Sequence, residues 1–193
     1  MNLPIKREEA IELLNSFPQI QSDLNHYLES EAIMRELASR LGEDIEYFGM
    51  LGLLHDVDWA ITKENTTEHL TKAPEILKKA GFDEEFIEII ISHGYGFDCA
   101  NLKDKKRTKK IEFALAASET LTGLIHAYAL MRDGKISDME SKGLMKKFKD
   151  KRFAAGCNRG IIKEIENLGL SLKEFFEIGI EGIKNIKDVV GLK

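Results

Sequence analysis

The sequence has little cysteine, little proline and no long apolar run. Of its 193 residues, 2 are cysteine and 3 are proline, while the 15 glycines are dispersed. Cys99 and Cys157 stand alone, without zinc or redox spacing, so free thiols are expected rather than a disulfide. The scarcity of proline permits long helices. The apolar runs fall far short of the ~20 residues that cross a membrane.

The chain also lacks a strong net charge of either sign. Lysine and arginine total 28 against 33 acidic residues, which gives a formal net charge of −5. A mildly acidic chain lacks the strong cationic surface that binding of bulk nucleic acid requires. The first residues, MNLPIKREEAIELL, are charged and amphipathic and contain no apolar signal core. A cytoplasmic protein with no membrane partner is therefore the expectation.

Two local runs of basic residues interrupt this acidic background. They comprise Lys103, Lys105, Lys106, Arg107, Lys109 and Lys110, and then Lys142, Lys146, Lys147, Lys149, Lys151 and Arg152. One interpretation is a pair of solvated surfaces, because lysines are mostly exposed. The other is electrostatic guidance of an anionic substrate. The sequence leaves both open.

Helical periodicity dominates, and no stretch alternates convincingly with period two. Helices are predicted over residues 7–16, 20–41, 43–56, 67–80, 84–92, 108–132, 137–149, 157–168 and 172–189. Thr66 is the expected N-cap of the fourth helix, and 94–107 is expected to be a loop. The prediction is one all-α domain over 1–193, a bundle of about eight or nine helices. Its core covers about 20–132, with helices of 137–190 packed on it.

The most informative short motif is GLLHDVDW, in which His55 is followed directly by Asp56. An ionised aspartate beside an apolar helix is costly without a partner. A metal ion, an arginine or a helix N-terminus would each supply one. Side chains of neighbouring helical residues point about 100° apart, so both can reach one ion only where the helix ends.

Two further helices carry polar side chains on their buried faces. His26 falls on the apolar stripe of the 20–41 helix, and Glu119 shares a face with Leu115 and Thr122. Together with the His55–Asp56 pair they would form a mixed nitrogen and oxygen ligand set. Such a set favours Fe, Mn, Co, Ni or Mg over a tetrahedral structural zinc. A bound ion would lower the pKa of water and so supply a nucleophile.

At this point the chain resembles the HD-domain metal-dependent phosphohydrolases of the HDIG type. HYLESEAIMRELASRLGEDIEYFGMLGLLHDVDW resembles the first half of the bacterial enzymes, and ALAASETLTGLIHAYAL the helix with the last ligand. SKGLMKKFKDKRFAAGCNR is similar to the downstream part of one bacterial branch. The resemblance implies metal ligation by His26, His55 and Asp56. Glu119 stands where the family usually has aspartate, and ligation through it or through water is implied.

The resemblance also extends to His69 and His93, which match histidines of members with two metals. It implies that they bind a second ion or contact a phosphate, with a capping or exposed histidine as the alternative. His126 is interpreted as structural. Asp58 and Glu68 are candidates for orienting water or for a general base, with plain solvation as the alternative.

The function implied is hydrolysis of a small phosphorylated substrate, such as a nucleotide, by a metal-activated water. Asp56, His69 and His93 are the expected catalytic residues. The expected cofactor is a divalent ion, with Fe, Mn, Co, Ni, Mg and Zn all open. The alternative is a non-catalytic, regulatory module that keeps the bundle, because one fold serves many functions.

Overall fold

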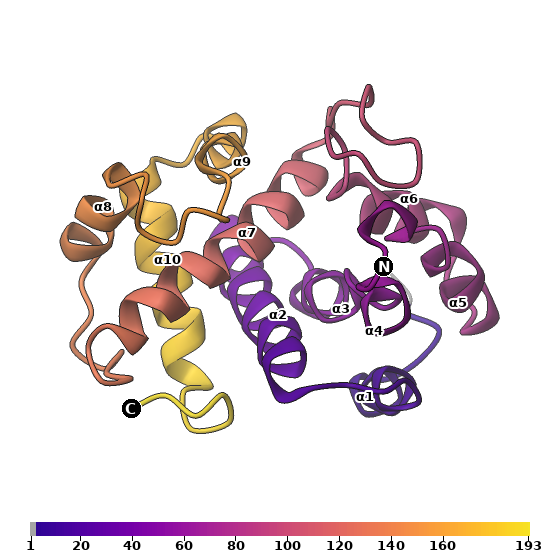
Figure 1. Cartoon of the computed structure of the whole chain (residues 1–193), viewed down its shortest axis with the longest axis horizontal. Coiled ribbons are helices and arrows are strands. Elements are labelled where there is room, and N and C mark those ends of the chain that lie inside the picture. The colour runs from indigo at the N-terminus through magenta and orange to yellow at the C-terminus, as the bar shows by residue number, and fades with distance from the viewer. Residues whose placement is uncertain (1–2) are drawn as a thin grey trace.

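The computed structural model describes residues 3–193, and this part of the chain is helical and contains no strand (Figure 1). Its α-helices are α1 (Arg7–Asn15), α2 (Gln21–Leu41), α3 (Ile45–Leu54), α4 (Trp59–Thr62), α5 (Ala73–Lys79), α6 (Glu84–Ser92), α7 (Lys110–Leu130), α8 (Ser141–Lys149), α9 (Arg159–Lys163) and α10 (Leu172–Asn185). Two 3-10 turns, η1 (Thr66–Glu68) and η2 (Glu164–Leu168), complete it. The all-α prediction is confirmed.

The long helix α2 lies at the centre, between α3 on one side and α7 and α10 on the other (Figure 1). Two glycines bring the neighbouring helices close. A Cβ at Gly52 of α3 would lie 2.6 Å from the carbonyl oxygen of Ser30, and one at Gly182 of α10 would lie 2.7 Å from that of Ala32. Both obstacles are backbone atoms of α2. The bundle therefore packs around α2 by direct contact between helix backbones.

The segment before α5 differs from the sequence-based prediction. A helix over 67–80 capped by Thr66 is wrong, because α5 begins only at Ala73 and 66–68 forms the turn η1. Backbone N–H groups of Leu70, Lys72 and Ala73 instead donate to the carboxylate of Asp58. Leu70 also has a left-handed backbone, with φ at 68°. A buried carboxylate has taken the donors that a continuous helix would have used.

The first basic run is not one solvated segment. Arg107 has a side chain only 5% exposed, and its guanidinium pairs with Glu164 of η2. It also donates to the carbonyl oxygens of Ser92, His93 and Tyr95, where α6 ends. A guanidinium suits this role because it carries several donors in a rigid plane. Arg107 therefore fastens the end of α6 to η2, whereas the lysines of the run are exposed.

The close contact at Gly52 gives the first prediction. Gly52→Ala should lower the free energy of unfolding by about 1–3 kcal/mol, because neither backbone can withdraw from the added methyl group. Helix propensity alone would give the opposite sign, a gain of ~1 kcal/mol. Urea denaturation measures the difference. In the control, Gly156→Ala, the added carbon meets nothing within 4 Å. An unchanged Gly52→Ala variant would contradict the tight packing.

Candidate metal centre

The His55–Asp56 pair lies directly after α3, which ends at Leu54. His55 is completely buried, and its Nδ1 lies 2.8 Å from the carbonyl oxygen of Gly52. Its Nε2 lies 3.0 Å from Nε2 of His26, which α2 supplies. The Oδ2 atom of Asp56 is 3.5 Å from Nε2 of His55 and 3.8 Å from that of His26. The end of α3 thus lets both neighbours face one point.

The second oxygen of Asp56 faces a second pair of histidines. Nε2 of His69 and Nε2 of His93 each lie 3.2 Å from Oδ1, and the two nitrogens are 3.2 Å apart. His69 comes from the segment after η1, and His93 is the C-cap of α6. Asp56 therefore belongs to two groups with metal-binding geometry, one with His26 and His55 and one with His69 and His93.

The hydrogen-bond partners of the four rings assign their tautomers. Nδ1 of His55 and Nδ1 of His93 face backbone carbonyl oxygens, and Nδ1 of His69 faces Asp58. Nδ1 of His26 lies 2.9 Å from the Thr122 hydroxyl, which itself donates to a carbonyl oxygen and so can accept. Each Nδ1 then carries the proton, by inference from this network. In this tautomer, the one that binds a metal ion, every Nε2 presents a lone pair on the side of Asp56; in the absence of an ion, Nε2 of His69 carries a proton and donates to Asp56.

Facing lone pairs make this a fitting cation site. Two unprotonated nitrogens 3.0 Å apart, such as those of His26 and His55, cannot hydrogen-bond to each other. Imidazole nitrogens with a carboxylate are a donor set that divalent transition metals accept. The Nδ1 contacts are also those that orient metal-binding histidines in proteins. The residues present therefore fit a divalent ion.

Charge and burial act in opposite directions here. Burial lowers the pKa of His55 to about 3, which keeps that ring neutral. Burial would raise the pKa of Asp56, but the surrounding imidazoles outweigh it and hold that pKa well below its ordinary value. His69 lies between two carboxylates, which overcome burial and raise its pKa to about 10. A cation at His69 must therefore displace a proton.

Asp58 is the functional residue whose role the sequence left undecided. Its side chain is fully buried, so solvation is the wrong interpretation. One carboxylate oxygen lies 3.2 Å from Nδ1 of His69, and both accept backbone N–H groups of 70–73. Asp58 therefore orients His69 and the loop that carries it. Glu68, the other candidate, is the last residue of η1. Its side chain is exposed to solvent and accepts a hydrogen bond from the Asn65 amide.

Glu119 lies near the centre but in neither metal group. Its carboxylate accepts a hydrogen bond of 2.5 Å from the Thr120 hydroxyl, and burial raises its pKa. It lines a cavity of about 210 Å³ together with His26, Phe97, Thr120, Thr122, Gly123, Gly156, Cys157 and Asn158. The predicted ligand thus borders the space beside His26.

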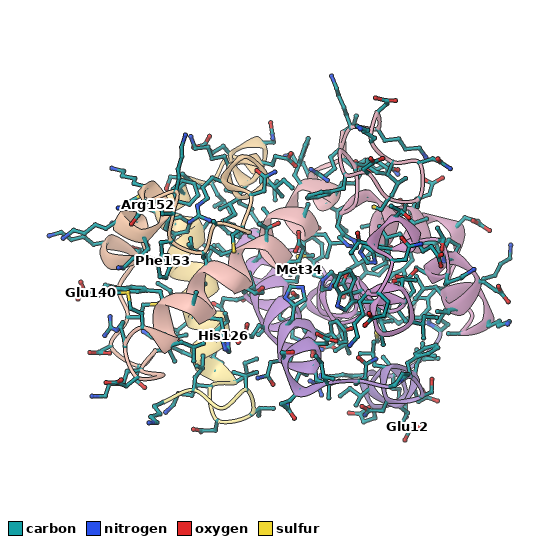
Figure 2. All side chains as sticks on the ribbon, in the orientation of Figure 1. Glu12, Met34, His126, Glu140, Arg152 and Phe153 are labelled. Carbon is teal, nitrogen blue, oxygen red and sulfur yellow. The ribbon has the colours of Figure 1, made fainter. Side chains whose placement is uncertain are left out.

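His126 lies apart from both groups, on α7 (Figure 2). Its Nδ1 is 2.6 Å from a carboxylate oxygen of Glu29 on α2, and Glu29 is only 2% exposed. The pair supplies a buried carboxylate with a cationic partner when the imidazole is protonated. This contact supports the structural interpretation of His126.

Comparison with known proteins bears on the same region. The HD domain family model matches residues 23–122, which include all four histidines of the centre and both aspartates. The chain belongs to the HD domain family. The match ends at Thr122, so α8, α9 and α10 lie outside this HD domain region.

The curated relatives of this HD protein include ribonucleases. Ribonuclease Y of Thermosipho melanesiensis is 36% identical over 73 residues, which are 38% of this chain and 14% of that protein. Ribonuclease Y of Mycoplasma mycoides subsp. mycoides SC is 31% identical over 102 residues, 53% of this chain and 18% of that protein. The match thus spans less than a fifth of each relative. The comparison with solved structures finds no match.

Among residues 3–193, no helix combines the length and the apolar character that crossing a bilayer requires.

The His126–Glu29 pair gives a prediction of pH dependence. The hydrogen bond to Glu29 raises the pKa of His126 above its ordinary 6.5. Its stabilising effect is therefore complete below about pH 6.5 and is lost as pH rises through the raised pKa. His126→Gln should unfold more easily than wild type by about 1.5–3 kcal/mol near pH 6, with a smaller difference at pH 9. Urea denaturation at both pH values measures it. A difference that grows with pH would refute the ion pair.

Proposed function

We propose that this HD protein is a metal-dependent phosphohydrolase that acts on a small phosphorylated substrate. The observation that carries the proposal is the position of Asp56, whose two oxygens each face a pair of imidazole nitrogens. Membership of the HD domain family supports it, since that family includes metal-dependent phosphohydrolases.

Two ions are proposed to share Asp56. His26 and His55 would hold the first with Oδ2, and His69 and His93 would hold the second with Oδ1. When bound, such ions supply Lewis acidity, which activates water and neutralises charge on a phosphoryl group. The mixed nitrogen and oxygen donors suit Mn, Fe, Co or Ni, and Mg or Zn are also in the proposed range.

The remaining residues are proposed to shape the space for the substrate. Glu119 would complete the first ligand group directly or through water. The adjoining cavity of about 210 Å³ is smaller than the ~300–1,000 Å³ typical of sites for drug-sized ligands, which favours a small substrate. Thr120 and Asn158 offer polar groups there, and Phe97, 44% exposed, offers a ring on which a nucleobase could stack.

The names of the relatives suggest which bonds to test. Ribonuclease Y is by name an enzyme that acts on RNA. We therefore propose that both phosphodiesters and phosphomonoesters be tested as substrates of this chain. One observation favours the second candidate function, a non-catalytic regulatory module: Glu119 replaces the usual aspartate and lies outside both metal groups.

The shared carboxylate gives a prediction about stoichiometry. Wild type should bind two Mn²⁺ ions per chain by calorimetry, and Asp56→Asn should weaken both events. His26→Ala should remove one and His69→Ala the other, because each ring belongs to one group only. Asp58→Asn should weaken the event that His69→Ala removes by about 10–100-fold, as expected when a ligand loses its orienting partner.

The matched control is His126→Ala, which removes an imidazole from neither group. Equal Mn²⁺ affinity of wild type and Asp56→Asn would contradict the proposal that Asp56 is a ligand of both ions. Loss of both events in His26→Ala, with the fold intact by circular dichroism, would indicate a single ion.

Hydrolysis tests the function itself. Metal-loaded wild type should cleave at least one of p-nitrophenyl phosphate, bis-p-nitrophenyl phosphate, a nucleotide panel and a short RNA. Asp56→Asn should abolish cleavage, and Glu119→Gln should lower kcat by about 10–1,000-fold if the carboxylate acts at the centre. His126→Ala should retain the rate. Full metal binding without cleavage of any substrate would favour the regulatory module.

A further inference from the structure

The connection between α8 and α9, residues 150–158, contributes one wall of the cavity beside the metal centre. This wall consists of residues 156–158, which line the cavity together with His26 and Glu119. The HD domain match ends at residue 122, so the wall comes from a later part of the chain. The residues that border the proposed hydrolase site thus extend beyond the HD domain region.

One side chain, that of Arg159, holds the connection in place. A guanidinium has five N–H donors in a rigid plane. In Arg159 they donate to five backbone carbonyl oxygens, those of Phe148, Asp150, Phe153, Ala154 and Cys157. The nitrogen–oxygen distances to Ala154 and Cys157 are 2.6 and 2.7 Å. The five donors are matched by five acceptors, which leaves none free for a ligand.

The shape of the connection departs from local backbone preference. Ala154 has a left-handed backbone, with φ at 42°, which is unfavourable for a residue with a Cβ atom. Phe153 packs edge-on against Tyr128 of α7, with the ring centroids 6.5 Å apart. Side-chain contacts, above all those of Arg159, therefore fix the position of the wall.

The wall lies against the turn of α7 that supports His26. A Cβ at Gly123 would lie 2.8 Å from Sγ of Cys157, so the absence of a side chain makes room for the wall. The preceding residue, Thr122, has its hydroxyl 2.9 Å from Nδ1 of His26. A displacement of the wall would therefore reshape the cavity next to a proposed metal ligand.

Asn158 gives the wall a hydrogen-bond donor. Its Oδ1 accepts the backbone N–H groups of Gly160 and Ile161, at 2.9 and 3.4 Å, and these donors identify that atom as the oxygen. Within residues 3–193 its Nδ2 makes no hydrogen bond. Asparagine amides donate to phosphate oxygens in many complexes. Asn158 is therefore held by its oxygen and offers its nitrogen to a ligand of the cavity.

We propose that residues 156–158 contact the phosphate group of the substrate and that Arg159 is the positioning residue that holds them there. The proposal rests on the proposed hydrolase function. Nδ2 of Asn158 would donate to a phosphate oxygen, and Arg159 would act only through the backbone of the wall. Because none of these residues belongs to a metal group, their substitution should weaken substrate binding and leave metal binding unchanged.

Cys157 reports on the wall without any hydrolysis. It lines the cavity and is half-buried, whereas Cys99 is buried and can be removed as Cys99→Ala. In Cys99→Ala protein loaded with Mn²⁺, inorganic phosphate should slow the alkylation of Cys157 by iodoacetamide in a saturable way. The phosphate concentration that gives half of this protection measures the affinity of the cavity.

Two variants and one control are compared in this background. Arg159→Lys keeps the positive charge but has three N–H donors for five acceptors. Asn158→Asp keeps a good helix N-cap but replaces the amide donor by a negatively charged acceptor. Each should raise the half-protecting phosphate concentration by about tenfold, as expected when a hydrogen bond to a charged group is lost. The control Arg152→Lys changes a residue of the same connection that is 95% exposed (Figure 2), and it should have no effect.

Kinetic constants separate positioning from catalysis. With any phosphate ester that wild type cleaves, Arg159→Lys and Asn158→Asp should raise KM by about tenfold and leave kcat within about twofold, which is the pattern of lost substrate binding. Calorimetry should show unchanged Mn²⁺ affinity in both variants.

Three results would overturn the proposal. The first is an absence of phosphate protection in wild type, and the second is equal protection in wild type, Arg159→Lys and Asn158→Asp. The third is a fall in kcat at constant KM. If the melting temperature shows that Arg159→Lys does not fold, Asn158→Asp decides between these outcomes. If no ester is cleaved but protection follows the expected pattern, the hydrolase function fails and the phosphate-binding wall stands.

Discussion

The structure depends on placing one carboxylate, that of Asp56, among four imidazole rings in the interior. An ionised carboxylate away from water needs partners on both oxygens. The two histidines of one group come from α2 and the end of α3, and those of the other from the segment after η1 and the end of α6. The bundle must therefore bring four separate parts of the chain to one residue. The centre and the core constrain each other.

Around these rings lies a layer of acceptors that holds each Nδ1. Gly52 and Ile90 offer carbonyl oxygens from the last turns of α3 and α6. Thr122 and Asp58 offer side chains. Helix ends are suited to this because their last carbonyl groups lack partners within the helix. Two of the four rings are thus held by atoms that any sequence would supply at a helix end.

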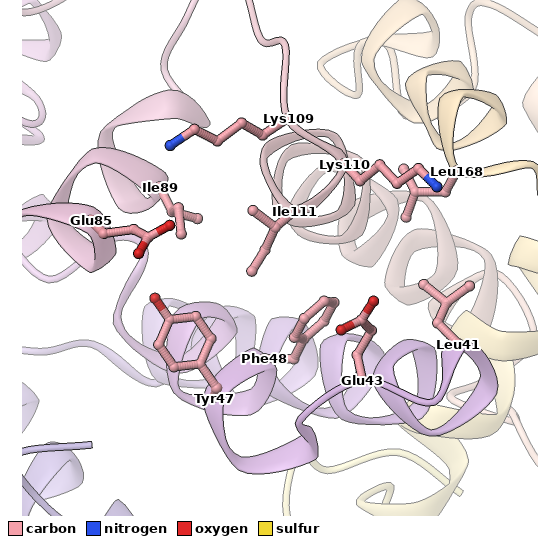
Figure 3. Close-up of a pocket in the computed structure, with 10 residues that line it drawn as sticks. All are labelled: Leu41, Glu43, Tyr47, Phe48, Glu85, Ile89, Lys109, Lys110, Ile111 and Leu168. Carbon is pink, nitrogen blue, oxygen red and sulfur yellow. The ribbon is translucent and has the colours of Figure 1, made fainter. Parts of the chain in front are cut away.

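The helices that form the metal centre also line a cavity of about 410 Å³ between α3, α6 and the start of α7 (Figure 3). Ile89 of α6 lines the cavity, and His93 caps the same helix one turn later. The start of α7 contributes Lys109 and Lys110 to the cavity, while Thr122 supports His26 further along the same helix. The two sites are distinct in their residues but share rigid elements. Arg107, bound where α6 ends, fastens that end of the helix to Glu164 of η2.

The sequence alone determined the all-α class and most helix bounds, because helical periodicity and the end of a helix are local properties. It also predicted a ligand set of His26, His55, Asp56 and Glu119, of which the structure brings the first three into one group. Family resemblance extended this to His69 and His93. Only the tertiary structure decided that both pairs share Asp56, that Asp58 orients His69 and interrupts the helix expected from residue 67, and that Arg107 is buried. Those outcomes depend on contacts between residues distant in sequence, where the burial of a carboxylate or guanidinium outweighs the local preference of the backbone.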